Sequence, residues 1–190
     1  MIHAPKRFRK AYHGPARFSR LRLVHYSNME PASAERRSAL VAFIRRRAAA
    51  PGPVESFEAD LVKAIAERLP WCNWVGFYML DPADPQTLVL GPFVGEPTPH
   101  TRIPVEQGIC GAAVASRSTI VVDDVNADPR YLACSIKTRS EIVVPIFAAG
   151  EVVGELDIDS HTPAAFTVAD REFFEEVARI VGGYISRRRT

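Results

Sequence analysis

Three cysteines, Cys72, Cys110 and Cys134, are the side chains of this sequence best suited to covalent chemistry. No two of them have the C-x-x-C spacing of a redox or zinc motif, and no histidine lies at a zinc-ligand interval from them. We therefore expect no metal site, and we expect any chemistry of these cysteines to be that of a thiolate. The alternative for each is the ordinary role of a small buried apolar residue.

Cys134 lies in a long irregular segment, residues 123–139. A segment of this length without its own secondary structure is often a binding loop or a lid. Arg130, Lys137 and Arg139 flank the cysteine in sequence. Their positive charges would favour the thiolate form of Cys134, which is the form that attacks.

Acidic side chains gather on one face of a predicted hairpin near the C-terminal end. Its strands, 141–147 and 151–159, flank a turn that suits a three-residue loop ending in glycine. This loop pairs Phe147 with Glu151, Glu141 with Asp157, and Arg139 with Asp159. One face is then apolar and carries Ile142, Val144, Ile146, Val152, Gly154, Leu156 and Ile158. The other face carries Glu141, Asp157 and Asp159, although exposed edge-strand charges are the alternative for the aspartates.

Two aromatic residues are predicted to share a face of an earlier strand. Trp74 and Tyr78 lie four residues apart in the strand-like segment 73–80, so their side chains point to the same side. Cys72, two residues before Trp74, would share that face. The ring of Trp74 could hold an ammonium group through a cation–π contact, while plain core packing is the alternative for both rings.

The remaining elements place these residues in an α+β domain. Helices are predicted at 34–47 and 57–69, a hairpin strand at 87–93, a short helix after Gly111, a strand at 119–122 and a terminal helix after Thr167. The helix at 57–69 has apolar residues three and four positions apart, and Pro70 ends it. Thr167 and Asp170 resemble a capping box. This order predicts one antiparallel sheet of about six strands flanked by helices.

The length of 190 residues, with 47% hydrophobic and 24% charged residues, suits one globular domain. No apolar run is long enough to span a bilayer, and the N-terminal segment lacks the apolar core of a secretory signal. We therefore expect a cytoplasmic protein. We divide it into a basic, disordered arm over residues 1–30 and a domain over residues 31–190, with Met29 as a candidate for the true start.

The net charge of +2 is unevenly distributed. Seven cations precede the first acid, and they are Lys6, Arg7, Arg9, Lys10, Arg17, Arg20 and Arg22. The rest of the chain is therefore net acidic. A basic arm can contact nucleic acid, but a tail without a specific partner is the simpler interpretation. The acidic body argues against nucleic acid as the main ligand.

Several motifs resemble those of the free methionine-(R)-sulfoxide reductases, a GAF-domain family. They are NWVGFY at 73–78, LGPF at 90–93, RIP at 102–104, GICG at 108–111, SEIVVP at 140–145 and LDIDS at 156–160. The resemblance implies a single GAF domain in which Cys134 is the catalytic cysteine and Cys110 the second cysteine of the pocket. It also implies that Trp74 is a pocket aromatic residue, and the shared strand face adds Tyr78.

The resemblance further implies a substrate site made by Glu141, Asp157 and Asp159, and a reaction that reduces free L-methionine-(R)-S-oxide. Clustered acids repel one another, so at least one is expected to have a raised pKa. A protonated Glu141, or else Asp157, would then donate to the sulfoxide oxygen. Attack by the thiolate would leave a sulfenic acid on Cys134.

Recycling of the sulfenic acid is where this sequence departs from the family pattern. Many members carry a further cysteine at the position that His100 occupies here. Cys110, an external thiol and Cys72 are therefore all open as the resolving thiol, in that order of preference. An external dithiol such as thioredoxin would reset the enzyme, no cofactor is implied, and the family implies a homodimer.

Two other functions remain compatible with a GAF domain, because one fold hosts many functions. A non-catalytic module could bind a small ligand such as a cyclic nucleotide, although an acidic trio suits a phosphate poorly. A redox sensor could form a Cys110–Cys134 disulfide without turning over a substrate. Release of methionine from its sulfoxide separates both from the enzyme.

Overall fold

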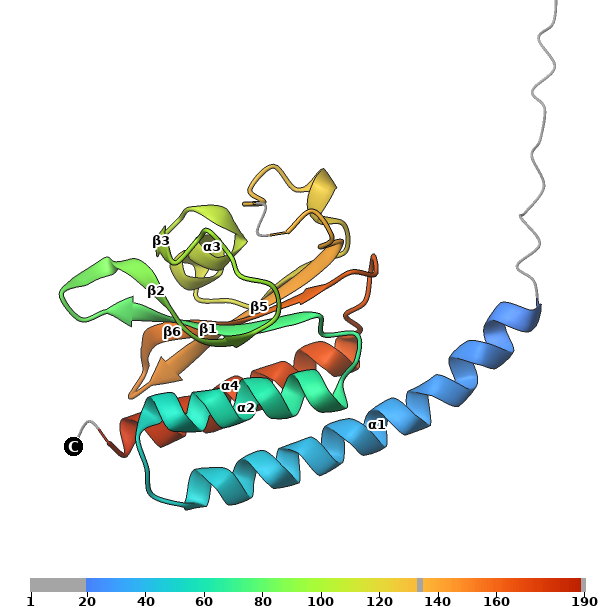
Figure 1. Cartoon of the computed structure of the whole chain (residues 1–190), viewed down its shortest axis with the longest axis horizontal. Helices are drawn as coiled ribbons and strands as arrows, with labels where there is room; N and C mark the ends of the chain where they lie inside the picture. The colour runs from blue at the N-terminus through green and yellow to red at the C-terminus, as the bar shows by residue number, and fades with distance from the viewer. Residues whose placement is uncertain (1–19, 133–134, 189–190) are drawn as a thin grey trace, which may run out of the picture.

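The computed structural model describes residues 20–132 and 135–188, with side chains described from residue 33 onward. Its elements are α1 (Arg20–Ala49), α2 (Val54–Arg68), β1 (Trp74–Asp81), β2 (Asp84–Val94), β3 (Arg102–Pro104), α3 (Gly108–Ser116), β4 (Ile120–Val122), the 3-10 helix η1 (Val125–Ala127), β5 (Ser140–Ala148), β6 (Glu151–Ser160) and α4 (Val168–Ser186) (Figure 1). The helix predicted at 34–47 is part of α1, which begins at Arg20. Residues 1–19 of the predicted arm lie outside the described residues. Among the helices of the described ranges, none is both long and apolar enough to cross a membrane.

The six strands form one sheet in the order β3-β2-β1-β6-β5-β4, and every neighbouring pair is antiparallel. The predicted α+β class, with an antiparallel sheet of about six strands, is therefore confirmed. Strands β1 and β6 lie at the centre, so their side chains are covered on both faces. This central position is where the predicted acids and aromatic residues are placed.

Helices α2 and α4 pack against one face of the sheet, and α1 lies outside them (Figure 1). The sequence of α2 explains its position, because Phe57, Leu61 and Ile65 recur every four residues and are fully buried. Burial of each such side chain contributes about 1.5–3 kcal/mol relative to leaving it exposed. Together with the apolar residues of β1, β5 and β6, these helices form the larger core.

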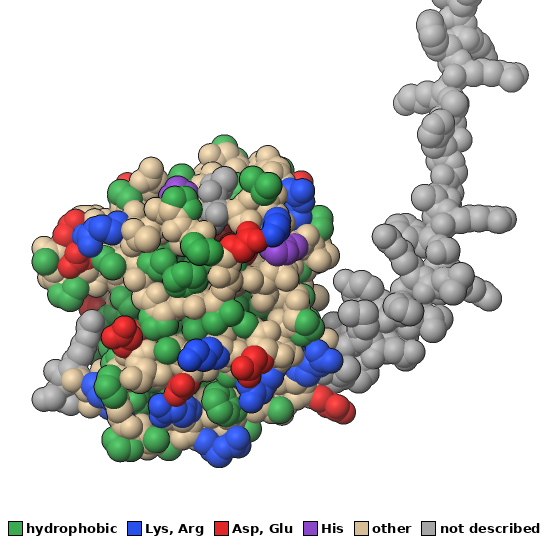
Figure 2. Space-filling view, in the orientation of Figure 1, with side chains coloured by type: hydrophobic (Ala, Val, Ile, Leu, Met, Phe, Trp, Pro, Cys, Tyr) green, Lys and Arg blue, Asp and Glu red, His purple; other side chains and the backbone are tan. Residues whose placement is uncertain are grey.

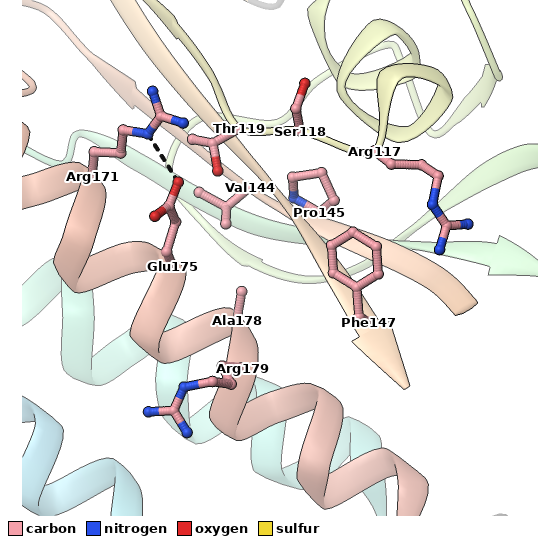
Figure 3. Close-up of a pocket in the computed structure, with 10 residues that line it drawn as sticks. All are labelled: Arg117, Ser118, Thr119, Val144, Pro145, Phe147, Arg171, Glu175, Ala178 and Arg179. Carbon is pink, nitrogen blue, oxygen red and sulfur yellow. Dashed lines mark hydrogen bonds and ion pairs between the residues drawn. The ribbon is translucent and has the colours of Figure 1, made fainter. Parts of the chain in front are cut away.

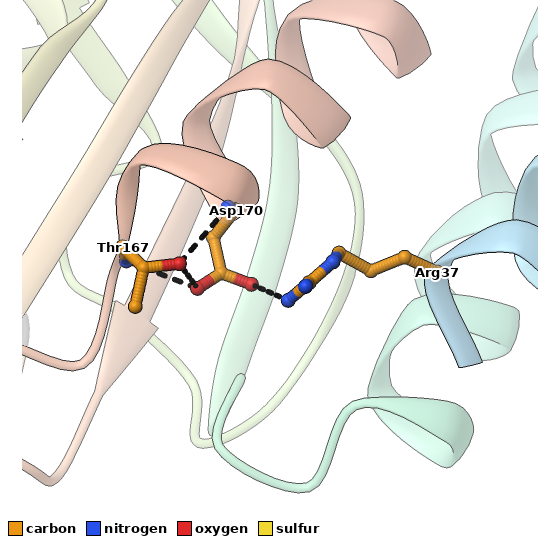
Figure 4. A network of polar contacts seen from close by, with 3 residues as sticks. All are labelled: Arg37, Thr167 and Asp170. Atoms are coloured by element: carbon orange, nitrogen blue, oxygen red, sulfur yellow. Dashed lines mark hydrogen bonds and ion pairs between the residues drawn. The ribbon is translucent and has the colours of Figure 1, made fainter. Parts of the chain in front are cut away.

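A buried ion pair joins α1 to the start of α4 (Figure 4). Thr167 caps α4: its hydroxyl accepts a hydrogen bond from the Asp170 backbone N–H, and the Asp170 carboxylate accepts one from the Thr167 backbone N–H. The predicted capping box is thus present. The other oxygen of Asp170 accepts a hydrogen bond from Arg37 Nη1 at 2.9 Å. One carboxylate therefore both starts α4 and holds α1 in place.

The opposite face of the sheet is covered by α3 and the segments around it, which form a second, smaller core. Its buried members are Trp74, Tyr78, Leu88, Ile103, Ile109, Cys110, Ala113, Val114, Val122, Val125 and Val143. Both predicted aromatic residues, Trp74 and Tyr78, and one predicted cysteine, Cys110, belong to this group. The candidate chemistry therefore lies on the side of the sheet away from α2 and α4.

The β5–β6 hairpin corrects the predicted register. The turn has two residues, Ala149 and Gly150, both with positive φ, and Ala148 pairs with Glu151. A bulge opposite Ile146 and Phe147 then adds a second one-residue offset. The predicted pairs Phe147–Glu151, Glu141–Asp157 and Arg139–Asp159 are wrong; the observed pairs are Phe147–Val152, Glu141–Asp159 and Val143–Asp157, with Arg139 N–H donating to Ser160 O.

The two offsets add to a shift of two residues, which restores each side chain beyond the bulge to its predicted face. The acids therefore share one face, as expected. Val152 is the exception, because it lies before the bulge and packs with the second core. Val153 takes its place in the larger core.

Candidate functional site

Four carboxyl groups are buried on the α3 side of the sheet. Three of them, Glu155, Asp157 and Asp159, alternate along β6, and Glu141 lies on β5 as the partner of Asp159. Their exposed fractions are 5% for Glu141, 0% for Glu155, 2% for Asp157 and 3% for Asp159. Acidic side chains are almost never buried to this extent without partners. The interpretation of the aspartates as exposed edge charges is therefore wrong, and a ligand site is the better account.

Glu155 is the member of this group that the sequence analysis missed. It lies two residues before Asp157, so the period of a strand already placed it on the same face. Neither Glu155 oxygen has a formed hydrogen bond to a described residue, and the same holds for one oxygen each of Asp157 and Asp159. Unsatisfied oxygens in a buried site call for protons or for a positively charged ligand.

Burial and mutual repulsion hold protons on these groups. Removal from water, followed by the charges of Asp157 and Asp159, raises the pKa of Glu141 well above its usual range. Burial raises the pKa of Asp157 to about 7, and a contact with Cys110 opposes that rise. Burial and Asp157 likewise raise the pKa of Asp159. At neutral pH the cluster therefore contains both neutral acids and carboxylates.

Cys110 brings a sulfur atom to this cluster from the first turn of α3. Its Sγ lies 3.6 Å from Asp157 Oδ2 and 4.0 Å from Glu141 Oε1. The three ligand atoms lie within 4.8 Å of one another. That spacing suits an ammonium group and would also admit a small metal cation.

The glycine after Cys110 explains how α3 comes so close to the strands. A Cβ at Gly111 would lie 2.6 Å from the carbonyl oxygen of Pro104 at the end of β3. Such a contact is not tolerated, so only glycine allows this turn of α3 to pack there. The glycine of the Gly-Ile-Cys-Gly motif thus allows the sulfur of Cys110 to lie next to the buried carboxyl groups.

Trp74 and Tyr78 form an aromatic wall beside the carboxyl groups. Their ring centroids are 6.3 Å apart, and the angle between the ring planes is 27°. On the neighbouring strand Trp74 pairs with Asp159, Gly76 with Asp157, and Tyr78 with Glu155. A Cβ at Gly76 would lie 2.3 Å from the Trp74 ring. The absent side chain at Gly76 therefore makes the space in which the indole lies next to the acids.

The loop that contains Glu96 and His100 holds both rings in position. Trp74 Nε1 donates a hydrogen bond to Glu96 O at 3.1 Å, and the Tyr78 hydroxyl donates one to His100 O at 2.6 Å. His100, the residue at the position of the missing third cysteine, is half-buried. It thus contributes a backbone carbonyl to the wall of the site.

Cys134 and its neighbour Ala133 lie outside the described residues, so the structure does not place the predicted nucleophile. The described residues on the two sides of it contact the loop that contains Glu96 and the start of α3. The Ser135 hydroxyl donates to Glu96 Oε2 at 3.3 Å, and Lys137 forms an ion pair with Glu96. Leu132 packs over Gly108 at the start of α3.

Two of the three cations predicted to flank Cys134 form ion pairs with acids. Lys137 pairs with Glu96, and Arg130 pairs with Asp128 at 2.7 Å. These pairs are exposed, and exposed pairs contribute little to stability. The two pairs lie on either side of Cys134 in the sequence, so they hold both ends of the segment that contains it.

Cys72 lies on the wrong side of the sheet to act in this site. It precedes β1 and packs in the larger core with the helices. Burial, followed by the charge of Asp170, raises the pKa of the Cys72 thiol well above its usual range. The expectation that Cys72 shares the face of Trp74 is therefore wrong, because the strand begins only at Trp74.

A separate groove of about 380 Å³ lies at the edge of β5, between α4 and the end of α3 (Figure 3). It is lined by Arg117, Ser118, Thr119, Val144, Pro145, Phe147, Arg171, Glu175, Ala178 and Arg179. Its lining has no cysteine, and its Arg171 is paired with Glu175 at 2.9 Å. The groove is therefore distinct from the acidic cluster and takes no part in its chemistry.

Comparisons with known proteins agree with this arrangement. The family model of the GAF domain matches residues 44–185. The chain is 42% identical over 120 residues to the free methionine-R-sulfoxide reductase of Escherichia coli, covering 62% of this chain and 70% of that protein. It is 40% identical over 110 residues to the free methionine-R-sulfoxide reductase of Saccharomyces cerevisiae, covering 57% of this chain and 61% of that protein.

A solved structure extends the similarity to nearly the whole of a relative. It is the free methionine-R-sulfoxide reductase from Neisseria meningitidis in complex with its substrate, with a TM-score of 0.76 and 37% identity. The match covers 81% of this chain and 92% of that chain.

Proposed function

Because this chain belongs to the free methionine-(R)-sulfoxide reductases, a family of GAF domains, we propose that it reduces free methionine-(R)-sulfoxide to methionine with a cysteine thiolate. The observation that carries the proposal is the buried group of carboxyls beside Cys110 and the aromatic wall. It is a site for a small, positively charged substrate. The reaction needs a thiol and an external dithiol such as thioredoxin, and no cofactor.

The substrate's ammonium group provides the charge that the cluster lacks. Asp157 and Asp159 each have a buried oxygen without a partner among the described residues, and an ammonium group would supply those hydrogen bonds. Trp74 lies beside Asp159 and offers a π face to the same cation. A methionine sulfoxide within a peptide has no α-ammonium group, so this arrangement favours the free amino acid.

In the first chemical step, the Cys134 thiolate attacks the sulfoxide sulfur and the oxygen is transferred to the cysteine. The protonated carboxyl of Glu141 supplies the proton that the oxygen takes up. The S–O bond of the substrate breaks, its sulfur is reduced by two electrons, and methionine leaves. Cys134 is oxidised to a sulfenic acid, and Glu141 becomes a carboxylate.

In the second step, Cys110 condenses with the sulfenic acid to form a disulfide and water. The support for Cys110 is its place at the acidic cluster, 3.6 Å from Asp157, whereas Cys72 lies on the other face of the sheet. An external dithiol then reduces the disulfide and restores both thiols. Because His100 stands where a third cysteine is common, the disulfide here is reduced directly by that external dithiol.

The test is methionine release from racemic free methionine sulfoxide with dithiothreitol, comparing the wild-type protein with Cys134→Ser. We expect wild-type turnover to stop near half of the racemate and the variant to release none. Cys72→Ala, on the other face of the sheet, is the matched control and keeps its activity. Turnover by Cys134→Ser at the wild-type rate would reject Cys134 as the nucleophile, and no turnover by folded, reduced wild-type protein would reject the reaction.

A further inference from the structure

Cys110, Glu141 and Asp157 have the geometry of metal ligands. Cys110 Sγ lies 3.6 Å from Asp157 Oδ2 and 4.0 Å from Glu141 Oε1, and the three ligand atoms lie within 4.8 Å of one another. In a tetrahedral site with Zn–S bonds of about 2.3 Å and Zn–O bonds of about 2.1 Å, a sulfur and an oxygen ligand are about 3.6 Å apart. The cysteine and Asp157 therefore already have the spacing of two zinc ligands, and Glu141 is a few tenths of an ångström farther away.

The polar atoms beside these ligands also lack partners. Asp159 is 3% exposed and lies opposite Glu141 on the neighbouring strand, yet its Oδ1 has no hydrogen-bond partner among the described residues, and the same holds for Oδ1 of Asp157. None of the ion pairs between described residues includes Glu141, Asp157 or Asp159. Buried carboxylates are ordinarily paired with a cation or coordinate a metal. The unpartnered oxygens thus point to a cation independently of the ligand spacing.

The mixture of sulfur and oxygen ligands selects the class of metal ion. Mg²⁺ and Ca²⁺ prefer oxygen ligands alone, whereas a thiolate favours softer ions such as Zn²⁺. Zinc accepts three protein ligands and leaves a fourth position to water or to another group, and Asp159 is the described side chain best placed to complete it or to hold that water. Because the three ligands come from α3, β5 and β6, no interval in the sequence indicated this site.

We propose that Cys110, Glu141 and Asp157 bind one thiophilic divalent cation of the zinc class, which excludes the ammonium group of the substrate from the same carboxyl groups. The metal site stands on its own geometry, and the competition rests on the proposed function. When the ion binds, the Cys110 S–H bond breaks, a sulfur–metal bond forms, and the proton leaves to solvent together with any proton held by the ligand carboxyls. No atom changes its oxidation state. The ion is thus an inhibitor of the proposed reaction and not a cofactor.

The binding test uses the reduced full chain with Cys134→Ser as the parent, because this substitution removes the thiol that the structure does not place. Cobalt(II) is the probe, since its bond to a thiolate gives a charge-transfer absorption band, and zinc is then titrated against it. We expect one cobalt ion per chain, the thiolate band, and displacement of cobalt by zinc. The band should persist when Cys72→Ala is added to the parent and disappear when Cys110→Ser is added.

Isosteric substitutions test the two carboxylate ligands. We expect Asp157→Asn and Glu141→Gln each to weaken zinc binding at least about tenfold, because even a partner outside the ligand set contributes about 10- to 100-fold to metal affinity. Glu151→Gln, which removes an exposed acid paired with Arg117, is the control and should bind zinc as the parent does. The inference is overturned if the folded parent binds neither ion, or if Cys110→Ser or Asp157→Asn binds zinc with the affinity of the parent. Should one variant fail to fold, the other decides.

Competition with the substrate distinguishes the metal site from the proposed function. Free methionine sulfoxide added to the cobalt-loaded parent should remove the thiolate band, whereas N-acetylmethionine sulfoxide, which has no ammonium group, should not. If cobalt binds through Cys110 and methionine sulfoxide does not displace it, the metal site stands and the proposed place of the ammonium group is wrong. If calorimetry shows that the parent binds methionine sulfoxide but no metal, the proposed function stands and the metal site is wrong.

Discussion

Each buried carboxyl of this site acts differently although all four lie on one face. Asp157 has a pKa of about 7 and contacts Cys110, so it changes charge near neutral pH. Glu141 and Glu155 are more strongly shifted toward the neutral acid, because both are fully removed from water beside other acids. Pairs of acids whose environments hold them in different protonation states are a common means of assigning acid and binding roles. Glu141, the proposed proton donor, and Asp157, one proposed ligand of the ammonium group, follow this division. The pKa of Asp159, the other proposed ligand, is also raised well above its usual range by burial and by Asp157.

Replacement of the proposed proton donor tests that division directly. Glu141→Gln keeps a hydrogen-bonding group but cannot give up a proton, so we expect methionine release at pH 7 to fall about 10²- to 10⁴-fold. Wild-type activity should also fall as the pH rises through the raised pKa of Glu141, because the reacting form is the neutral acid. Stopped assays between pH 6 and 10 measure both effects.

The control for this substitution is Glu151→Gln at the exposed start of β6. Glu151 pairs with Arg117 far from the acidic cluster, so its loss should leave methionine release unchanged at every pH. If Glu141→Gln turned over at a near-normal rate at neutral pH, the donor would have to be another member of the cluster, with Asp157 next.

At the level of single residues, the sequence predicted which residues gather in the site better than it predicted how they contact one another. Glu141, Asp157, Asp159, Trp74 and Tyr78 do lie together, because strand periodicity alone places them on common faces. The contact of Cys110 with the cluster could not be read in the same way. It depends on Gly111 packing against Pro104, a contact between residues that no periodic pattern relates.

At the level of elements, the hairpin shows why a correct face can accompany a wrong register. The bulge at Val153 is invisible in an alternating pattern, because a valine suits either face. Its one-residue offset combines with that of the two-residue turn. A single offset would have turned the acids into the larger core, where their burial would be prohibitive. The acids themselves thus require the two irregularities to occur together.

Helix α2 carries a buried acid of its own, which makes stability depend on pH. Glu58 is 3% exposed, one of its oxygens has no hydrogen-bond partner among the described residues, and burial followed by repulsion from Glu55 raises its pKa to about 7. A raised pKa in the folded state means that the contribution to stability is present below pH 4.5 and is lost as the pH rises through 7. Glu58 therefore opposes folding in alkaline solution.

Glu58→Gln should remove this dependence. We expect the variant to gain up to about 3 kcal/mol relative to wild type between pH 5 and pH 9, the order of magnitude that such a pKa difference implies. Urea unfolding at the two pH values measures the change. Glu67→Gln, at an exposed position of the same helix, is the control and should show no such gain; an equal gain there would assign the effect to the net charge of α2.

In the whole molecule, the two faces of the sheet serve different purposes: one provides most of the packing, and the other carries the proposed site. The face covered by α2 and α4 is the larger core and accounts for most of the buried apolar residues. The other face combines a smaller core with the acids, Cys110 and the aromatic wall. The clustered carboxyl groups destabilise the fold, but it tolerates them because apolar side chains on the opposite face of the same strands pack in the larger core. The sequence predicted this architecture, since it depends on periodicity, whereas the homodimer implied by the family remains a prediction.

The charges on the surface of the described residues differ in their arrangement from those of the basic N-terminal segment. In Figure 2, positive and negative side chains are interspersed over the helical side of this face rather than gathered by sign. The cations of residues 1–19 are Lys6, Arg7, Arg9, Lys10 and Arg17. Residues 1–19 contain no acid, so this segment would attract polyanions, and that attraction would weaken with salt.

Deletion of residues 1–19 tests whether that segment matters to the reaction. The buried carboxyl groups, Cys110 and the aromatic wall all lie in β1, α3, β5 or β6, so we expect the truncated protein to release methionine within about twofold of the full chain. Light scattering on both proteins would measure the predicted dimer and its dependence on the segment. Gel retardation with duplex DNA at low salt is the complementary measurement. Retained activity with lost DNA retention would make the segment an electrostatic tail, whereas lost activity in a dissociated protein would show that assembly through this end supports the site.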